Sequence, residues 1–417
     1  MRRSEIRFDL PSTSSEGGLC LLKKADEELG LTKRLAACLS DRRRGPQHKP
    51  AKMLAQRIYG ICQGWEDCND FDRLREDPML GLALGEPPAT QPTLSRFETA
   101  RSRRELHAMS KALVELFIEN HRSRVPKRIV IDMDATDDPA HGQQEFEFFH
   151  GFYGHHCFLP LFVFCSVDGQ DEELVGAVLR PGNSHAGRRS AALLSRLVKM
   201  LKTAFPKVEI LFRADAGFAL PQVYERCEDL GIDYLISLAR NERLETQAAP
   251  LMAESRARYV QDGQKSRHFG ELTYAAKTWT KERRVIVKAE VMAQGENPRF
   301  VVTNMSGQAQ TLYDEYCQRG DCENRIKELK LDLLSGRTSC HKFTANCFRL
   351  LLHAAAFVLL SAVRRMLWGT EPARATMGQI RLKLLKIAAQ VQISTRRVLV
   401  RMPRGHPHAA LLARLLD

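Results

Sequence analysis

Short apolar and β-branched runs alternate with helical patterns through the middle of the chain. The runs KRIVIDMDAT, CFLPLFVFCSVDG and ELVGAVLRPG predict extended strands, and the Asp168–Gly169 pair predicts a turn. AGRRSAALLSRLVKMLKTAF, VEILFRADAG, LPQVYERCEDLG and DYLISLAR then predict a helix, a strand, a helix and a strand. Consecutive strands followed by this alternation predict an α/β fold with a mixed sheet, in which an antiparallel meander joins parallel crossover units.

The flanking segments have other patterns. From Asp26 to about Asn120, apolar residues recur at helical spacing between prolines, which predicts a small basic helical module. Residues 241–305 contain polar linkers and further strands such as RRVIVKAEVM, and they predict a β-rich insertion. A long helix from about Leu312 to Leu334 and a buried helix over residues 344–366 are predicted to follow.

Charge narrows the class of partner. The chain has 417 residues, 44% of them hydrophobic, and a formal net charge of +13. This composition excludes global disorder and favours a polyanionic partner, either nucleic acid or a membrane surface.

The best apolar run, Leu350 to Val363, is interrupted by His353 and is too short to span a bilayer, so we expect no membrane partner. The N-terminus lacks an apolar signal core and the 11 cysteines form no C-x-x-C, which predicts reduced thiols in a cytosol.

Three acidic residues stand out by their positions. Asp134 ends the first predicted strand of the sheet, Asp215 follows the apolar strand VEILF, and Glu323 lies on the long helix. A carboxylate at the carboxyl end of a strand points into the crevice where α/β sheets bind ligands. Neighbouring carboxylates repel unless cations lie between them, and oxygen ligands suit Mg²⁺ or Mn²⁺.

The helix around Glu323 carries a spaced set of polar residues. Tyr316, Arg319, Glu323 and Lys330 stand in the pattern Y-x2-R-x3-E-x6-K. At about 100° per residue, the four side chains of a continuous helix project within roughly a 60° arc. Cations beside a carboxylate suit a phosphate backbone held at a metal site, whereas the plainer alternative is a solvated stripe of helix salt bridges.

This pattern resembles the signature of bacterial insertion-sequence transposases of the DDE type. The segments IDMDATDDPAHG, RADAGF and CENRIKELKLDLLSGRTSCHKFTANCFRLLLHAAAFVL are similar to the insertion-sequence family thirteen-eighty within that group. The resemblance covers the chain from about Lys49 to about Pro403.

The resemblance implies a ribonuclease-H-like catalytic core with a β-rich insertion. It implies that Asp134, Asp215 and Glu323 bind two Mg²⁺ or Mn²⁺ ions for phosphodiester cleavage at transposon ends and for strand transfer to a target. Tyr316, Arg319 and Lys330 would hold phosphates or terminal bases, and Thr136 would orient the metal site or DNA. The expected domains are a helical DNA-binding module (1–125), the first part of the core (126–240), the β-rich insertion (241–305), the Glu-bearing and closing helices (306–366) and a basic tail (367–417).

Further DNA contacts are predicted from single segments. TLSRFETA resembles the start of a DNA-reading helix, from which Arg96 would project, and Trp279 in the insertion could stack on an extruded base or simply pack in a core. The histidines of HGFYGHHC suit structural or DNA-contacting roles better than zinc. From Arg364 onward the tail carries a net charge of about +9, and we expect it to bind the DNA backbone.

Some alternatives stay open from the sequence. Asp132 lies on the same strand face as Asp134 and is the other candidate for the metal ligand. The expected partners are double-stranded DNA, namely terminal inverted repeats and target DNA, and a second copy of the chain in a homodimer on DNA. The expected location is the bacterial cytoplasm, at the nucleoid. Rival functions are another ribonuclease-H-like nuclease or resolvase, and a domesticated DNA-binding protein that has lost cleavage.

Overall fold

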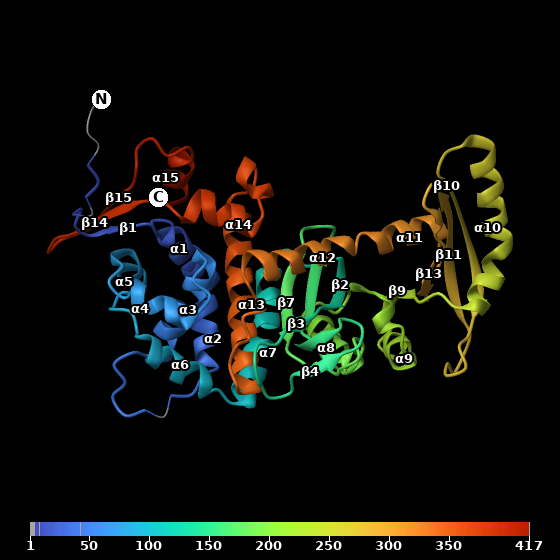
Figure 1. Cartoon of the computed structure of the whole chain (residues 1–417), viewed down its shortest axis with the longest axis horizontal. Coiled ribbons are helices and arrows are strands. Elements are labelled where there is room, and N and C mark those ends of the chain that lie inside the picture. The colour runs from blue at the N-terminus through green and yellow to red at the C-terminus, as the bar shows by residue number, and fades with distance from the viewer. Residues whose placement is uncertain (1–4, 8, 42, 417) are drawn as a thin grey trace. The chain divides into compact units, whose positions relative to one another are not determined.

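The chain folds into two compact units (Figure 1). The computed structural model describes residues 5–7, 9–41 and 43–416. The first unit combines Met1–Leu113, Ala140–Phe146 and Lys327–Asp417, and the second combines Val114–Pro139 with Glu147–Ile326. Each unit is therefore assembled from segments that lie far apart in the sequence.

A nine-stranded mixed sheet is the frame of the second unit. Its strands run in the order β10-β11-β13-β9-β8-β2-β6-β7, and the short β12 pairs with β11. Strand β2 pairs antiparallel with β6 and parallel with β8, and β8 pairs parallel with β9. The predicted mixed α/β sheet is thus confirmed. The strands are β2 (Arg128–Ala135), β6 (Leu161–Val167), β7 (Glu173–Val178), β8 (Glu209–Ala214), β9 (Asp233–Leu238), β10 (Ser266–Tyr274), β11 (Arg283–Met292), β12 (Gly295–Glu296) and β13 (Arg299–Thr303).

The turn between β6 and β7 is the one that the sequence predicts. Asp168 has φ of 50° and Gly169 has φ of 77°, and both values lie in the left-handed region. Asp and Gly tolerate this region better than branched residues do, which is why this dipeptide can reverse the chain into an antiparallel strand.

Helices cover both faces of this sheet. Helices α8 (Ser190–Ala204), α9 (Pro221–Asp229) and α10 (Glu242–Asp262) pack with the end of α7 (Arg103–Asn120) on one face, where Ile131 and Phe212 are buried. Helix α11 (Ala309–Cys317) packs through Leu312 on the opposite face, against Leu211. Residues of β8 alternate between the two cores, so the strand is apolar on both sides along most of its length.

The segment 241–305, which is predicted as a β-rich insertion, begins with a long helix. Helix α10 has 21 residues, and the Asn241 side chain caps it by accepting a hydrogen bond from the Leu244 backbone N–H at 3.1 Å. Only a narrow stripe of this helix is buried, namely Leu244, Ala248, Met252 and Ser255. Because most of its other residues are polar, the sequence shows no clear helical pattern of apolar positions. The strands that follow extend the main sheet, because β13 pairs with β9.

The long helix predicted over Leu312 to Leu334 is divided. Helix α11 ends at Cys317, α12 (Gly320–Lys327) follows, and a π-helical turn spans Glu328–Asp332. The break falls beside Arg319, so the four signature residues do not share the single continuous helix on which their predicted arc depends.

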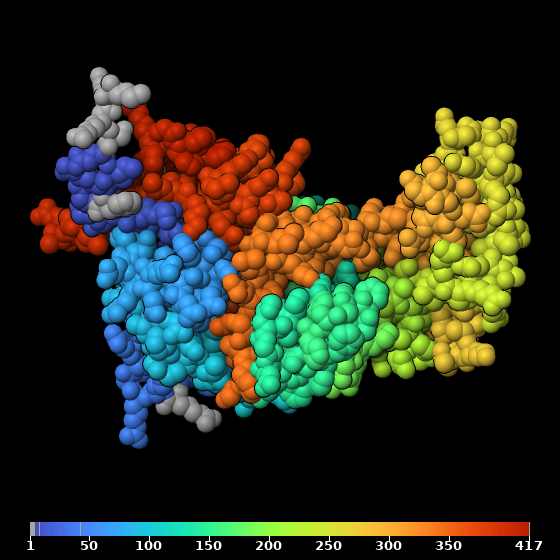
Figure 2. Space-filling model, viewed as in Figure 1, coloured from blue at the N-terminus to red at the C-terminus, as the bar shows by residue number. Residues whose placement is uncertain are grey.

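Helices dominate the first unit, and its two ends meet in one small sheet. Strand β1 (Thr13–Ser14) pairs with β14 (Ala389–Ile393), which pairs with β15 (Val398–Arg401). Figure 2 shows the blue N-terminal and red C-terminal segments adjoining. The helices are α1 (Leu19–Leu29), α2 (Leu31–Ala37), α3 (Pro50–Gln63), α4 (Phe71–Leu74), α5 (Pro78–Leu84), α6 (Gln91–Thr99), α13 (Phe343–Met366), α14 (Met377–Ile380) and α15 (Ala409–Leu416).

Helix α13 is the apolar axis of this unit. Among the described residues, it is the one helix long and apolar enough to cross a membrane by length and composition. However, 83% of its apolar window is buried inside the protein, as in the core helix of a soluble protein. Its contacts with α3 in the core explain why the sequence is apolar on most of its circumference.

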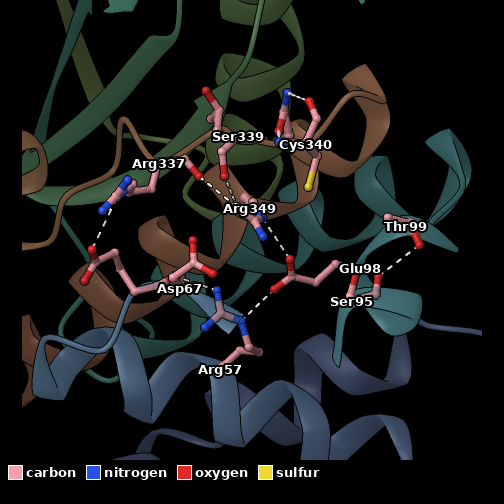
Figure 3. Close-up of polar contacts among 12 residues, drawn as sticks. Arg57, Asp67, Ser95, Glu98, Thr99, Arg337, Ser339, Cys340 and Arg349 are labelled. Carbon is pink, nitrogen blue, oxygen red and sulfur yellow. Dashed lines mark hydrogen bonds and ion pairs between the residues drawn. The ribbon is translucent and has the colours of Figure 1, made fainter. Parts of the chain in front are cut away.

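A buried ion cluster ties α3, α6 and α13 together (Figure 3). Glu98 accepts hydrogen bonds from Arg57 at 2.6 Å and from Arg349 at 2.8 Å, and the side chains of Glu98 and Arg57 are 1% exposed. Arg349 also donates to the Ser339 hydroxyl at 2.6 Å. A single carboxylate thus compensates two buried guanidinium groups.

Replacing Glu98 with Gln should destabilise the protein strongly. The change keeps the shape of the side chain but leaves two buried cations without a counter-charge, a loss of about 3–5 kcal/mol in the free energy of unfolding. Urea unfolding would measure it, with Arg96→Gln on the same helix as the control, because Arg96 is exposed and its change should stay within about 0.5 kcal/mol. Equal stability of the two variants would contradict this account.

Candidate active site

Two neighbouring strands deliver Asp134 and Asp215 to one edge of the sheet. Asp134 is the penultimate residue of β2, and Asp215 directly follows β8. Because β2 and β8 are parallel, their carboxyl ends meet at the same edge. The two aspartates lie on the sheet face that α11 covers, since Ile131 and Phe212, at alternate positions, point to the opposite core.

Arg319 joins Asp134 to Glu323. Its guanidinium donates to Asp134 Oδ2 at 3.1 Å and to Glu323 Oε1 at 2.5 Å, and its side chain is only 12% exposed. Against the effect of burial, the charges of Asp134, Tyr316 and Glu323 raise the pKa of Arg319, and the Tyr316 ring lies 6.1 Å from that of Tyr313. The structure therefore brings together five residues that the sequence singles out: Asp134, Asp215, Tyr316, Arg319 and Glu323.

Burial and neighbouring negative charge raise the pKa of two of the three carboxylates, Asp134 and Asp215. Burial raises the pKa of Asp134 to about 6, and the charges of Asp215 and Glu323 add to this, while Arg319 opposes it. Burial also raises the pKa of Asp215, and Glu323 contributes in the same direction. The opposing contributions to Asp215 come from Arg319, from the Gly217 backbone N–H, which donates to Asp215 Oδ1 at 2.9 Å, and from His185. Negative charge is thus concentrated here beyond what one arginine neutralises.

The chemistry of these side chains fits a hard divalent cation. They offer carboxylate oxygens only, and their mutual repulsion is what a cation would relieve. Within the part of the chain that the structure describes, however, no group of three or more His, Cys, Asp or Glu residues is spaced to hold a metal ion as it stands. Arg319 supplies the positive charge between Asp134 and Glu323 in this arrangement.

Asp132, the alternative to Asp134, is engaged elsewhere. It is fully buried, and Arg213 grips it with two hydrogen bonds, Nε to Oδ1 at 2.9 Å and Nη2 to Oδ2 at 2.7 Å. The two residues are direct neighbours in the β2–β8 register. Both Asp132 oxygens are thereby occupied, whereas Asp134 lies one step nearer the edge, beside Asp215 and Glu323.

Arg213 joins the two strands that lead to Asp134 and Asp215 to α11, the helix that precedes the Glu323-bearing α12. It extends from β8, binds Asp132 on β2, and donates to the Glu315 backbone carbonyl on α11 at 2.9 Å. Glu172 lies 4.0 Å from the same guanidinium, and burial together with Asp132 raises the pKa of Glu172 to about 9. The raised pKa favours the protonated form of Glu172 at neutral pH, and both side-chain hydrogen bonds between Arg213 and a carboxylate go to Asp132.

The remaining predicted residues lie outside this cluster. Thr136 follows β2, and its hydroxyl donates to Asp137 at 3.4 Å. Trp279 is half-buried, packs edge-on against Tyr224 and Tyr274 with ring centroids 5.0 and 5.5 Å apart, and has the Arg283 guanidinium over its ring. Arg96 and Lys330 belong to the first unit, where Arg96 is exposed on α6.

Sequence reasoning missed Arg213 and Glu172. A signal for Arg213 was present, because it precedes Asp215 by two residues just as Asp132 precedes Asp134, so that both pairs share a strand face. The pairing of Arg213 with Asp132 required the register between β2 and β8, which no local pattern contains. Glu172 carries no signal in its segment, QDEEL.

Comparison with known proteins defines the class. The family model for the transposase DDE domain, group 1, matches residues 2–417, so the chain belongs to this family of DDE transposases. No curated protein sequence matches it. Among solved structures, the Mos1 transposase paired-end complex with the left transposon end is similar to it at 13% identity, with a TM-score of 0.18, over 47% of this chain and 61% of that chain. The matched region therefore spans less than two thirds of the Mos1 chain.

Arg213→Met should show how much the buried ion pair contributes to the free energy of unfolding. It leaves Asp132 as an uncompensated buried anion, for which we expect a loss of about 3–5 kcal/mol in the free energy of unfolding. Glu172→Gln is the matched control at pH 7, because the group that it replaces is already neutral, and it should stay within about 0.5 kcal/mol. Chemical denaturation measures both. A strong loss in Glu172→Gln would show that Glu172 is charged.

Proposed function

We propose that this protein is a metal-dependent DNA transposase that cleaves phosphodiester bonds at transposon ends and transfers the cut strands to target DNA. The observation that carries the proposal is the meeting of Asp134, Asp215 and Glu323, which are remote in the sequence, at one sheet edge in a member of the DDE transposase family. The insertion-sequence family thirteen-eighty remains the proposed subgroup.

The order of the central strands supports a ribonuclease-H-like core. Strands β7, β6 and β2 form an antiparallel meander, and β8 and β9 then add to β2 in parallel. This arrangement puts the acids on β2 and at the end of β8 next to each other, and α12 brings Glu323 to the same place. The proposal thus needs no rearrangement of the sheet.

The three carboxylates would hold two Mg²⁺ or Mn²⁺ ions. Such ions, when bound, activate the attacking water or 3′-hydroxyl and stabilise the leaving oxygen of a phosphodiester. Asp134, Asp215 and Glu323 would supply the oxygen ligands, and the negative charge that they concentrate at one place favours cations. Arg319 and Tyr316 would bind a DNA phosphate, because a guanidinium released from Glu323 matches the geometry of phosphate oxygens.

DNA would be held by basic surfaces outside the core. Arg396 and Arg397 are exposed in the turn between β14 and β15, within the basic C-terminal tail. We assign phosphate contacts to this tail and to Lys330, a DNA-reading role to Arg96, and supporting contacts at the transposon end to Thr136 and Trp279. Two ends must be joined, so the working form is a homodimer on DNA in the bacterial cytoplasm.

Neutralising any of the three acids should abolish cleavage. Asp134→Asn, Asp215→Asn and Glu323→Gln should each lower Mn²⁺-dependent cutting of a duplex carrying the inverted repeats that flank the gene by about 10³-fold, since a catalytic metal supplies several kcal/mol. Asp314→Asn, an exposed acid on α11, is the control and should keep full activity. DNA binding without cutting by the unchanged protein would instead favour the domesticated DNA-binding protein.

Metal affinity should weaken in mild acid. Since the pKa of Asp134 is raised to about 6, protons compete with cations for this carboxylate as the pH falls through 6. Calorimetric titration with Mn²⁺ between pH 5 and pH 8 should show affinity constant above about pH 7 and falling by up to about ten-fold per pH unit below 6. Asp134→Asn should bind weakly with a flatter pH profile; an unchanged profile would remove Asp134 from the metal site.

A further inference from the structure

An aromatic hairpin extends beside the three acids. Strands β4 (Phe148–His150) and β5 (His155–Phe158) pair antiparallel, and β5 also pairs with β3 (Asp138–Pro139). The turn between β4 and β5 contains Phe152 and Tyr153. Phe149 is 57% exposed and Phe152 is 86% exposed, although phenylalanine is normally withdrawn from water.

The turn of this hairpin is close to the acidic cluster. Ala135 at the end of β2 pairs with Leu161, and the Thr136 backbone N–H donates to the Pro160 carbonyl at 3.2 Å, so the hairpin leaves the sheet at the edge that carries Asp134. Burial raises the pKa of Tyr153 to about 12, and the charges of Asp137, Asp134 and Asp215 contribute. His155 contacts Asp137, three residues after Asp134, at 3.1 Å. The pairing of Asp138 with Phe158 anchors the hairpin to the chain that leaves β2.

The base of the hairpin is packed closely against neighbouring backbone, whereas its turn is exposed to solvent. Gly182 lies so close to β5 that an added Cβ would come within 1.9 Å of the Cys157 carbonyl oxygen. Arg180, itself buried, donates to the Leu159 carbonyl at 2.9 Å. At the turn, the Phe152 ring meets Tyr153 edge-on at 5.0 Å, and Phe152 remains in solvent.

We propose that Phe149 and Phe152 form a stacking site for an unpaired nucleobase next to the scissile phosphate. This inference rests on the proposed function, because the position of the DNA follows from the three acids. Because β5 runs into β6 at the edge of the sheet where β2 ends, the hairpin lies at the edge that carries Asp134, and bases next to a phosphate held there would meet its exposed rings. Aromatic rings of this kind stack on unpaired bases or enter between base steps irrespective of sequence. DNA therefore fits this surface better than a protein partner.

The test compares two DNA probes that differ in base pairing alone. One is a fully paired 30-base-pair duplex, and the other is the same duplex with a central three-base bubble that contains 2-aminopurine. We expect the unchanged protein, in Ca²⁺ to prevent cutting, to bind the bubble about five-fold or more tightly than the duplex and to quench the 2-aminopurine fluorescence, because the rings stack on the unpaired base.

Variants of the hairpin assign the effect to its rings. The double change Phe149→Ala and Phe152→Ala should abolish the preference and the quenching, with duplex affinity unchanged. Phe152→Trp should retain both. Val260→Ala is the matched control, since Val260 is also an exposed apolar residue of the second unit, 77% exposed on α10, and it should behave as the unchanged protein.

Several results would overturn the inference. Persistence of the preference in the double variant would place the stacking site elsewhere. An equal loss of affinity for both probes, or a change in circular dichroism, would make the hairpin a general support. Conversion of a dimer to a monomer, measured by sedimentation without DNA, would make it an interface between copies of the chain.

The stacking test and the cleavage test fail separately. Binding and quenching are measured without catalysis, so a protein that stacks the base but never cuts DNA would refute the proposed function and leave the stacking site intact. Cleavage that is lost in Asp134→Asn and unaffected in the double phenylalanine variant, with no quenching in either protein, would refute the stacking site alone.

Discussion

The buried pair of Arg213 and Asp132 is the constraint on which the acidic cluster depends. It joins the two parallel strands that end at Asp134 and Asp215, and the same guanidinium reaches the backbone of α11, just before the residues that hold Glu323. Three mutually repelling carboxylates do not converge by their own interactions. An ion pair that is already desolvated between the strands fixes their register and so opposes that repulsion.

Charge compensation is organised in two layers on the same sheet face. In the inner layer, Arg213 is balanced by Asp132, while the neighbouring Glu172 remains protonated. In the outer layer, Arg319 spans Asp134 and Glu323 and leaves Asp215 without a comparable ion pair among the described residues. The inner layer is structural because both of its partners are withdrawn from solvent. The outer layer is exchangeable, since Glu323 is 48% exposed and its bond to Arg319 can be replaced by bonds to other cations.

The first unit uses the same principle for another purpose. Glu98 on α6 neutralises Arg57 and Arg349 in a core formed largely by α13. This arrangement fixes α6 through buried charges alone. In both units, buried guanidinium groups join elements that are distant in the sequence.

The sequence by itself determined the strand and helix order of the core, the Asp168–Gly169 turn and the three acidic positions, because strand alternation, turn preference and the chain position of an acid are local properties. It did not determine that the predicted long helix divides beside Arg319 or that residues 242–262 form α10, since the buried stripe of that helix is narrow. Only the tertiary structure decided between Asp132 and Asp134 as the residue at the edge, because that choice follows from the register of β2 with β8 and from the guanidinium of Arg213. The position of the aromatic hairpin beside the acids likewise follows from the pairing of β3 with β5. Nothing in the sequence of either segment predicts that these two strands pair.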